Sequence, residues 1–333
     1  MLMRVSTTNK IIKKFIMKKI LISILAIAAL VSCSKNSIVD MSEGEAITFG
    51  NVFVDNSTKA ADMTYSGDSE DKVLTSFNLY GTVTGTAGTV NIYNGCEVTG
   101  EVGTNVWTCP VNQYWIAGAN YSFAAVVDGQ VASINDNGMP LTIRCNTTVY
   151  DNNIQKDLLY ATASATGQAS ANAPVNFTFS HLLSKAQFTV TSNTTNGWYY
   201  SVKDIKINNY LEGTYTIASG VWVGTSKDNT LFGNIENVTS SNKDGKTCNF
   251  QRLLIPTTED FTVTFTVELW NDNGDETDVK ISTQSYTKTV SQDLKAGNAY
   301  DFNINLSVGE LIQFTVTENP TWENNPGADV TIQ

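Results

Sequence analysis

The chain has 333 residues, of which 16% are charged and 10% are aromatic, and it carries a formal net charge of −11. This length suffices for two ordinary domains or for one large β domain. An acidic chain without a basic cluster argues against nucleic acid as a partner and against electrostatic binding to anionic lipid.

Residues 1–32 have the layout of a secretory signal peptide. Two lysines precede an almost unbroken apolar run from Ile20 to Val31. A run of about a dozen residues is too short to cross the ~30 Å hydrocarbon core of a bilayer as a helix. A buried core helix is the weaker alternative, because a polar stretch follows the run at once. Residues 1–16 form an over-long start, so Met17 is the predicted initiator.

The signal ends in Leu30-Val31-Ser32-Cys33, which resembles a bacterial lipobox. In a lipobox the cysteine becomes the first mature residue and is acylated, so the resemblance implies a lipid-anchored protein outside the cytoplasm. Such a cysteine usually carries more than one acyl chain, and several chains anchor stably where one anchors marginally. Removing residues 1–32 takes away six of the 21 basic and none of the 32 acidic residues, so the net charge becomes −17.

After Cys33 the apolar residues recur with period two, which predicts short β-strands. The leader, residues 33–59, contains one predicted strand, Ile47–Val54, and then a polar connector. In the strand Phe261–Leu269 every second residue is apolar, so its register should be well fixed. The other predicted strands are, in chain order, Phe77–Tyr80, Thr89–Tyr93, Tyr121–Val127, Phe177–Phe179, Phe188–Val190 and Val202–Ile207.

Asn-Gly and Asp-Gly pairs separate these strands and mark hairpins, because both suit positions with φ > 0. They are Asn94-Gly95, Asp128-Gly129, Asn137-Gly138, Asn196-Gly197, Asp244-Gly245 and Asn273-Gly274. The best candidates for a helical turn are Asp157–Ala161 and His181–Lys185. Short strands with frequent turns predict an all-β fold of two tandem β-sandwiches. The small, polar stretch Ala161–Pro174 is the predicted linker between sandwiches of residues 60–172 and 173–333.

Four cysteines remain beyond Cys33, and export would permit disulfides among them. They are Cys96, Cys109, Cys145 and Cys248. Cys96 and Cys109 bracket a predicted hairpin, so a bridge between them is one hypothesis, although four cysteines allow three connectivities. Free thiols buried as small apolar residues are an equally good interpretation. With no C-x-x-C pair and one histidine, we expect no zinc site.

No catalytic centre and no cofactor are predicted. His181 is the single histidine, and catalysis would need a nucleophile or carboxylate beside it; a G-x-S-x-G nucleophile elbow is missing. The run Asn271–Asp275 looks like a calcium loop but lacks the terminal Glu, so a hairpin turn is the better interpretation. A glycan-binding protein that stacks sugars on residues such as Trp115 or Trp198 is the leading alternative, although we favour the core for these aromatics. A secreted hydrolase with paired carboxylates is a third.

One segment of the chain resembles a family. Phe177–Val190 is similar to the F-x-F-x-H-x-L-[AS]-K segment of the fimbrillins, the type V pilins and related surface lipoproteins of Gram-negative gut and oral anaerobes. The chain order also fits, with a lipobox, a leader, a Thr-Lys-Ala site at 58–60 and a tail that contains Trp322. The matching residues are Phe177, Phe179, His181, Leu183 and Lys185.

This resemblance implies transthyretin-like sandwiches in a structural or adhesive fimbrial subunit at the outer membrane, which is not an enzyme. It also implies a maturation step, in which a trypsin-like protease cuts after Lys59 and removes the leader. The leader strand, with Ile47, Phe49, Val52 and Val54, would leave a groove. A strand of another subunit would fill that groove through main-chain hydrogen bonds and alternate side chains.

The donor candidate is the alternating stretch Leu311–Thr317, with Leu311, Phe314 and Val316 as its apolar residues. An ordinary last strand of the C-terminal sandwich is an equally good interpretation. Many relatives have arginine at the cleavage position, whereas this chain has none between Cys33 and Arg144. An arginine-specific protease would leave the leader in place, which favours an anchor or tip subunit that binds a host or bacterial surface receptor.

Overall fold

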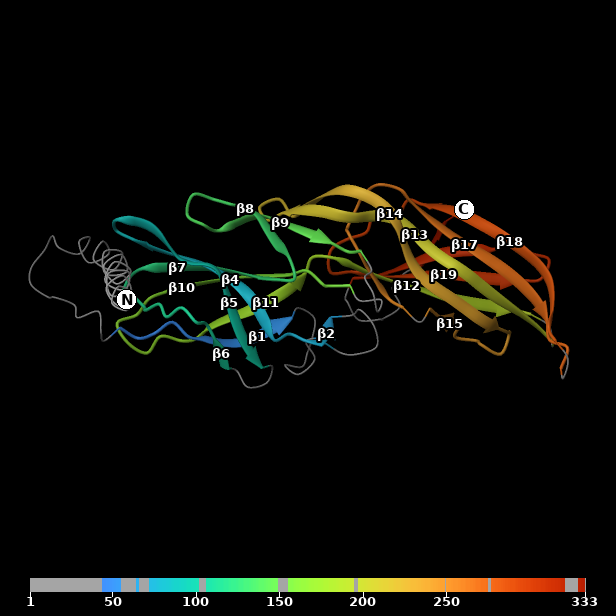
Figure 1. Ribbon diagram of the computed structural model, residues 1–333, viewed down its shortest axis with the longest axis horizontal. Helices are drawn as coiled ribbons and strands as arrows, with labels where there is room; N and C mark the ends of the chain where they lie inside the picture. The colour runs from blue at the N-terminus through green and yellow to red at the C-terminus, as the bar shows by residue number, and fades with distance from the viewer. Residues whose placement is uncertain are drawn as a thin grey trace, which may run out of the picture.

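The computed structural model describes residues 44–54, 64–65, 72–101, 106–148, 155–194, 197–248, 250–274, 277–320 and 329–332. All regular elements in these ranges are β-strands, which confirms the all-β class. Figure 1 shows an elongated molecule with the early strands towards one end and the late strands towards the other. Within the same ranges no helix is long and apolar enough to span a membrane.

The early strands form a sheet that closes on itself in the order β1-β11-β10-β7-β4-β5-β6, where β6 pairs with β1 again. We call it the closed sheet. Its strands are β1 (Phe49–Val54), β4 (Ser76–Gly85), β5 (Gly88–Glu101), β6 (Val106–Thr108), β7 (Asn120–Val127), β10 (Leu159–Thr166) and β11 (Val175–His181). A short separate pair consists of β2 (Thr64–Tyr65) and β3 (Lys72–Val73). Closure leaves β1 with a neighbour on both sides.

The late strands form two further sheets. One has the order β15-β12-β19-β20-β21, with β16 paired to β12, and the other has the order β18-β17-β13-β9-β8, with β14 paired to β13. The strands of the first are β12 (Ser184–Asn193), β15 (Lys246–Thr247), β16 (Arg252–Leu254), β19 (Ala299–Ser307), β20 (Gln313–Asn319) and β21 (Asp329–Ile332). Those of the second are β8 (Gln130–Ile134), β9 (Pro140–Asn146), β13 (Trp198–Thr216), β14 (Val221–Val238), β17 (Phe261–Asn271) and β18 (Val279–Val290).

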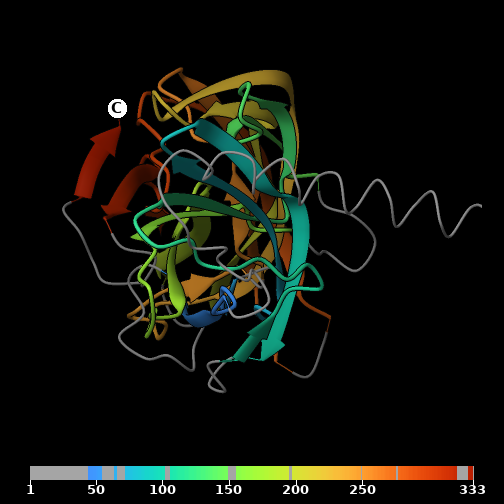
Figure 2. The same cartoon turned by 90° about the vertical axis from the view of Figure 1, so that its left-hand side faces the viewer.

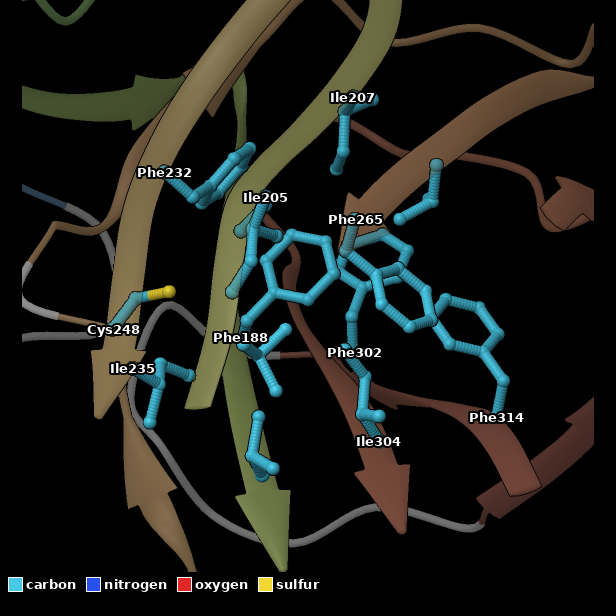
Figure 3. Close-up of a cluster of buried hydrophobic side chains, with 14 of the residues drawn as sticks. Phe188, Ile205, Ile207, Phe232, Ile235, Cys248, Phe265, Phe302, Ile304 and Phe314 are labelled. Atoms are coloured by element: carbon cyan, nitrogen blue, oxygen red, sulfur yellow. The ribbon is translucent and has the colours of Figure 1, made fainter. Parts of the chain in front are cut away.

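The core of the late sheets is aromatic, as Figure 3 shows. The rings of Phe188 and Phe302 stack with centroids 5.0 Å apart, and Phe232 meets Phe188 edge-on at 4.8 Å. Phe265 of β17 stacks on Phe314 of β20 at 6.3 Å, so the two sheets share one core. Such ring pairs add to the stability that burial alone provides.

The predicted strand at 261–269 is confirmed as part of β17, with Phe261, Val263, Phe265 and Val267 buried. The hairpin signals hold in part. The glycines at 95, 138, 197, 245 and 274 all have positive φ, but only Gly138 and Gly274 join strands that pair with each other, β8 with β9 and β17 with β18. Gly95 lies inside β5, and the other signals connect strands of different sheets. At the Asp128-Gly129 pair the positive φ of 53° falls on the aspartate instead.

Two local predictions are wrong. The helical turns expected at Asp157–Ala161 and His181–Lys185 are absent from these residues, which lie in or beside β10, β11 and β12. The predicted linker begins with a strand, because Ala161–Thr166 pairs residue by residue with β7. The small side chains of this strand are explained by packing, because the alanines at 161, 163 and 165 lie against the large rings of the closed sheet.

The sheets cross the predicted boundary at residues 172/173. β11 completes the closed sheet, whereas the β8–β9 hairpin, earlier in the chain, pairs through β9 with β13 of a late sheet. The division into two transthyretin-like domains therefore stays a prediction.

Candidate functional site: the slot of the leader strand

The leader strand β1 completes the closed sheet. On one side it runs parallel to β11, with Phe49 opposite Val175 and Val54 opposite Phe179. On the other side it runs antiparallel to β6, with Phe49 opposite Trp107. Because β6 and β11 are joined through β1 in this sheet, removing β1 would open the sheet and leave two unpaired strand edges.

The residues just before β1 continue its pairing with the chain that follows β6. Ile47 donates its backbone N–H to the carbonyl of Gln113 at 2.8 Å, and Trp115 donates to the carbonyl of Glu45 at 2.9 Å. Thr48 accepts a bond of 2.8 Å from the backbone N–H of Val175, on the β11 side. Main-chain hydrogen bonds therefore hold the leader strand along both sides.

The predicted apolar residues of the leader point into the closed sheet. Ile47, Phe49, Val52 and Val54 are all buried, with exposed fractions between 4% and 7%. Phe49 contacts three aromatic rings at centroid distances between 5.9 and 6.4 Å, and they belong to Tyr93, Phe123 and Phe177. Burial of a large apolar side chain contributes about 1.5–3 kcal/mol, so an emptied slot would be strongly unfavourable in water.

The spacing of these residues depends on an irregularity at Gly50. The register of β1 against β11 shifts between Phe49 and Val52, so both side chains face inward although they are three positions apart. Asn51 donates its N–H to the Asn176 side-chain oxygen at 2.8 Å. A Cβ at position 50 would lie 2.6 Å from that same oxygen, so only glycine fits here without displacing its neighbours.

We call the space that β1 fills the leader slot. Its walls are the strands β6 and β11, and its floor is made of aromatic side chains from the closed sheet. Those side chains are Phe77, Tyr93, Trp107, Phe123, Phe177 and Phe179. An apolar groove with two free strand edges is suited to an extended peptide with alternate apolar residues.

A polar contact ties the leader to the loop before β11. The Glu45 carboxylate accepts hydrogen bonds of 2.8 Å from both the backbone and the side-chain nitrogen of Asn172. These bonds lower the pKa of Glu45. The site is exposed, so its contribution to leader binding is small.

Some predicted residues fall outside this description. Cys33 and Lys59 lie outside the described residues, so lipidation and cleavage stay predictions. In the donor candidate, Leu311 is 91% exposed and precedes β20, whereas Phe314 and Val316 are buried in the core of their own subunit. β20 pairs with β19 and with β21. Its donor role stays a prediction, and within the described residues the terminal strand β21 pairs on one side only.

The structure brings Cys96 and Cys109 together. Their Sγ atoms lie 2.7 Å apart as thiols, Cys96 on β5 and Cys109 just after β6. Burial, with the hydrogen bond to Cys96, raises the pKa of Cys109 to about 12. Cys145 and Cys248 are buried free thiols in different clusters, and burial raises the pKa of each to about 12. They are inert core residues.

A buried hydrogen-bonded pair of side chains lies where β11 leads into β12. The Nδ1 of His181 is 2.5 Å from the Oδ2 of Asp157, and both side chains are almost fully buried. Lys185, also buried, has its pKa lowered by desolvation and partly restored by the charge of Asp157. The sequence analysis missed Asp157, although the histidine and lysine of the fimbrillin-like segment were the available signal. Burial of the pair from solvent favours a structural role.

The other candidate sites are weaker. In the part of the chain that the structure describes, no three His, Cys, Asp or Glu residues gather as a metal site. The Asp272 side chain accepts the N–H of Gly274 at 2.8 Å, as in a hairpin turn. Trp115 is buried against Tyr121, with ring centroids 4.7 Å apart, so it cannot stack on a sugar.

One aromatic pair is more accessible. Tyr199 and Trp270 lie on neighbouring strands with parallel rings 6.2 Å apart, and Lys280 lies over the Trp270 ring at 5.0 Å. The Tyr199 hydroxyl donates to Asp278 at 2.7 Å. Trp198, which precedes the pair, is half-buried. This arrangement of half-buried rings and charged side chains is a candidate surface for sugar stacking.

Solved structures and a family profile both match this chain. A fimbrial protein from Bacteroides vulgatus has the same fold, with a TM-score of 0.60 and 16% identity over 83% of this chain and 99% of its own. A candidate cell adhesion protein from Bacteroides uniformis aligns with a TM-score of 0.51 and 14% identity, over 84% of this chain and 98% of its own. No curated protein matches the sequence. The profile of the fimbrillin-like family matches residues 52–320. The chain therefore belongs to the fimbrillin-like family.

Proposed function

We propose that the protein is a structural or adhesive subunit of a cell-surface fimbria, and that assembly exchanges its leader strand for a strand of another subunit. The observation that carries the proposal is the position of β1 in the closed sheet. It pairs on both sides, and together with Ile47 just before it the strand buries four apolar side chains. Its fold is shared with a fimbrial protein. No catalytic activity is part of the proposal.

The proposed route begins with export. The signal at 1–32 is removed, Cys33 is acylated, and the lipid holds the subunit at the outer membrane. A trypsin-like protease then cuts after Lys59, which lies between β1 and the strands that follow it in the chain. The fragment with the lipid and β1 stays in its slot until another strand displaces it.

We propose β21 of another copy as the donor in place of Leu311–Thr317, because Phe314 and Val316 of that stretch are buried in their own subunit. β21 is a short strand at the edge of its sheet, and its sequence Asp-Val-Thr-Ile alternates polar and apolar residues. In Figures 1 and 2 the blue β1 and the C-terminus lie well apart, so a subunit does not fill its own slot with this strand. Main-chain pairing with β6 and β11 would supply the affinity.

Limited trypsin digestion of residues 34–333 tests the proposal. We expect a first cut after Lys59, because its context from Asn56 to Asp62 is polar, and then ladders of oligomers on gels run without boiling. The Lys59→Gln variant should be spared at this position and stay monomeric. First cuts elsewhere, or a protein cut after Lys59 that stays monomeric, would contradict the stalk-subunit role.

The digestion experiment also bears on two alternative functions, an anchor or tip subunit and a glycan-binding protein. Because the chain has no arginine between Cys33 and Arg144, an arginine-specific protease would leave the leader in place, and the subunit would act as an anchor or tip. A lipid-anchored glycan-binding protein is the second candidate, and the accessible pair of Tyr199 and Trp270 favours it. If the protein is cut after Lys59 and stays monomeric, the glycan-binding function at Tyr199 and Trp270 becomes the favoured one.

A further inference from the structure

The wall of the leader slot on the β6 side depends on the leader itself. β6 is three residues long, and its described pairing with β5 consists of Thr99 to Thr108, Gly100 to Trp107 and Glu101 to Val106. The segment that follows, up to Trp115, pairs with the leader through Ile47, Ala46 and Glu45. We call residues 106–115 the slot wall.

Loss of β1 would remove much of the support of the slot wall. The main-chain bonds that Gln113 and Trp115 make to the leader would be lost, and Trp107 would lose its partner Phe49. The described contacts that would remain lie near the two ends. At the β6 end they are the short pairing with β5 and the contact of the Trp107 ring with Phe77, whose centroids lie 5.3 Å apart. At the other end they are the contacts of the Trp115 ring with Tyr121 and Phe123, a bond of 3.2 Å from the Gln113 side chain to the Ile92 carbonyl, and the Tyr121 hydroxyl bonds around Tyr114 and Ile116.

Cys109 lies in this wall, and Cys96 of β5 lies beside it. Cys109 follows β6 directly, and its Sγ lies 2.7 Å from that of Cys96. Cys96 belongs to the part of β5 that pairs with β4, opposite Leu79, so it is anchored in the closed sheet independently of the leader. A bond between these sulfurs would attach the slot wall to a strand that stays in place when β1 leaves.

We propose that Cys96 and Cys109 form a disulfide that holds the slot wall open and in register while the leader slot is empty. The inference rests on the proposed strand exchange and adds a covalent requirement to it. The bond closes a loop that contains all of β6, so it restricts the wall at the stage when hydrogen bonds to a leader or donor are missing.

The chemistry is a thiol–disulfide exchange after export. The two thiols give up two protons and two electrons to a disulfide-bearing oxidant protein, which is reduced to its dithiol as the Cys96–Cys109 bond forms. A mixed disulfide between one cysteine and the oxidant is the intermediate, and the second thiolate displaces the oxidant. An exported protein meets such oxidants, whereas cytoplasmic thiols stay reduced.

The test compares mature protein from an oxidising compartment with the Cys96→Ser/Cys109→Ser variant. Mass spectrometry should find wild-type protein lighter by two hydrogens, with the bond between these cysteines. Hydrogen exchange in residues 106–115 should be the same for both proteins before cleavage. After cleavage at Lys59 and removal of the leader, exchange in the variant should be about tenfold faster or more. Cys145→Ser is the matched control and should behave as wild type.

Two results would overturn the inference: free, alkylatable Cys96 and Cys109 in the exported protein, or equal exchange of residues 106–115 in the wild type and the variant after leader removal. Uptake of a leader peptide by the cleaved wild-type protein is measured in parallel. If the oxidised protein keeps an ordered wall but takes up no strand, the proposed function fails and the disulfide's effect on the wall stands. If both proteins take up the peptide equally fast, the bond has no role in assembly.

Discussion

A chain that starts at Ala60 will bind a peptide of residues 44–54, and Phe49→Asp in that peptide will weaken binding by about 100-fold or more. Phe49 is 4% exposed and touches three aromatic rings. Loss of its burial removes about 1.5–3 kcal/mol, and an unpaired carboxylate in an apolar slot adds a desolvation cost. Isothermal titration calorimetry measures both affinities.

The matched control for this prediction is Thr48→Asp. Thr48 is the neighbouring residue in the leader and its side chain is exposed, so this peptide should bind nearly as well as the original. Equal affinity of the Phe49→Asp peptide and the original would show that the apolar slot does not select the strand. A chain from Ala60 that binds none of the three peptides would show that the slot collapses when β1 is missing.

Replacing Asp157 by alanine will lower the free energy of unfolding by about 3–5 kcal/mol. The change removes the carboxylate that lies 2.5 Å from the His181 Nδ1, and with it a negative charge that raises the pKa of buried Lys185. A buried polar group that loses its partner costs more than the pair itself contributes. Urea denaturation of the uncut protein, followed by tryptophan fluorescence, measures the loss.

Lys156→Ala is the control for this second prediction. Lys156 is the preceding residue, but its side chain is 69% exposed and its ion pair with Asp128 at 3.4 Å lies at the surface. We expect a change of less than about 1 kcal/mol, as for other exposed pairs. A similarly small change for Asp157→Ala would mean that the buried pair does not stabilise the junction between β11 and β12.

The sequence predicts the local elements of this fold well where one face of a strand is buried. The alternation from Phe261 to Leu269 places four side chains in the core, as observed in β17. The leader strand is likewise found at Phe49–Val54, within the predicted range. Both predictions follow from the two-residue period of a half-buried strand, which needs no knowledge of the partner strands.

The alternation of apolar residues does not predict which strands pair with each other over long distances in the chain. Nothing in the leader indicates that β1 runs parallel to β11, more than a hundred residues later, or that β9 joins a late sheet. The small, polar residues of Ala161–Pro174 predict a linker, whereas the alanines of Ala161–Thr166 lie in a strand and fit against large rings. This segment is a strand because it pairs with β7, and the sequence alone does not indicate that pairing.

In the candidate site, too, the sequence predicts the local features but not those that depend on distant residues. The apolar leader residues could be identified from spacing, and the cysteine pair from its position around a hairpin. The bulge at Gly50, which lets both Phe49 and Val52 point inward, has no signal in the alternation, which it interrupts. Asp157 was equally hidden, because its partner His181 lies 24 residues away and the two meet only through the pairing of β10 with β11.

The measurement that tests strand exchange most directly is the size of a mixture of two variants. The acceptor, residues 60–320, has an open slot but lacks β21; the donor, residues 34–333 with Lys59→Gln, has β21 but keeps its slot filled. Size-exclusion chromatography with light scattering should find each variant monomeric alone and a one-to-one complex, and nothing larger, in the mixture. Two monomers in the mixture, or assembly of the acceptor by itself, would contradict exchange of the leader strand for a carboxyl-terminal strand.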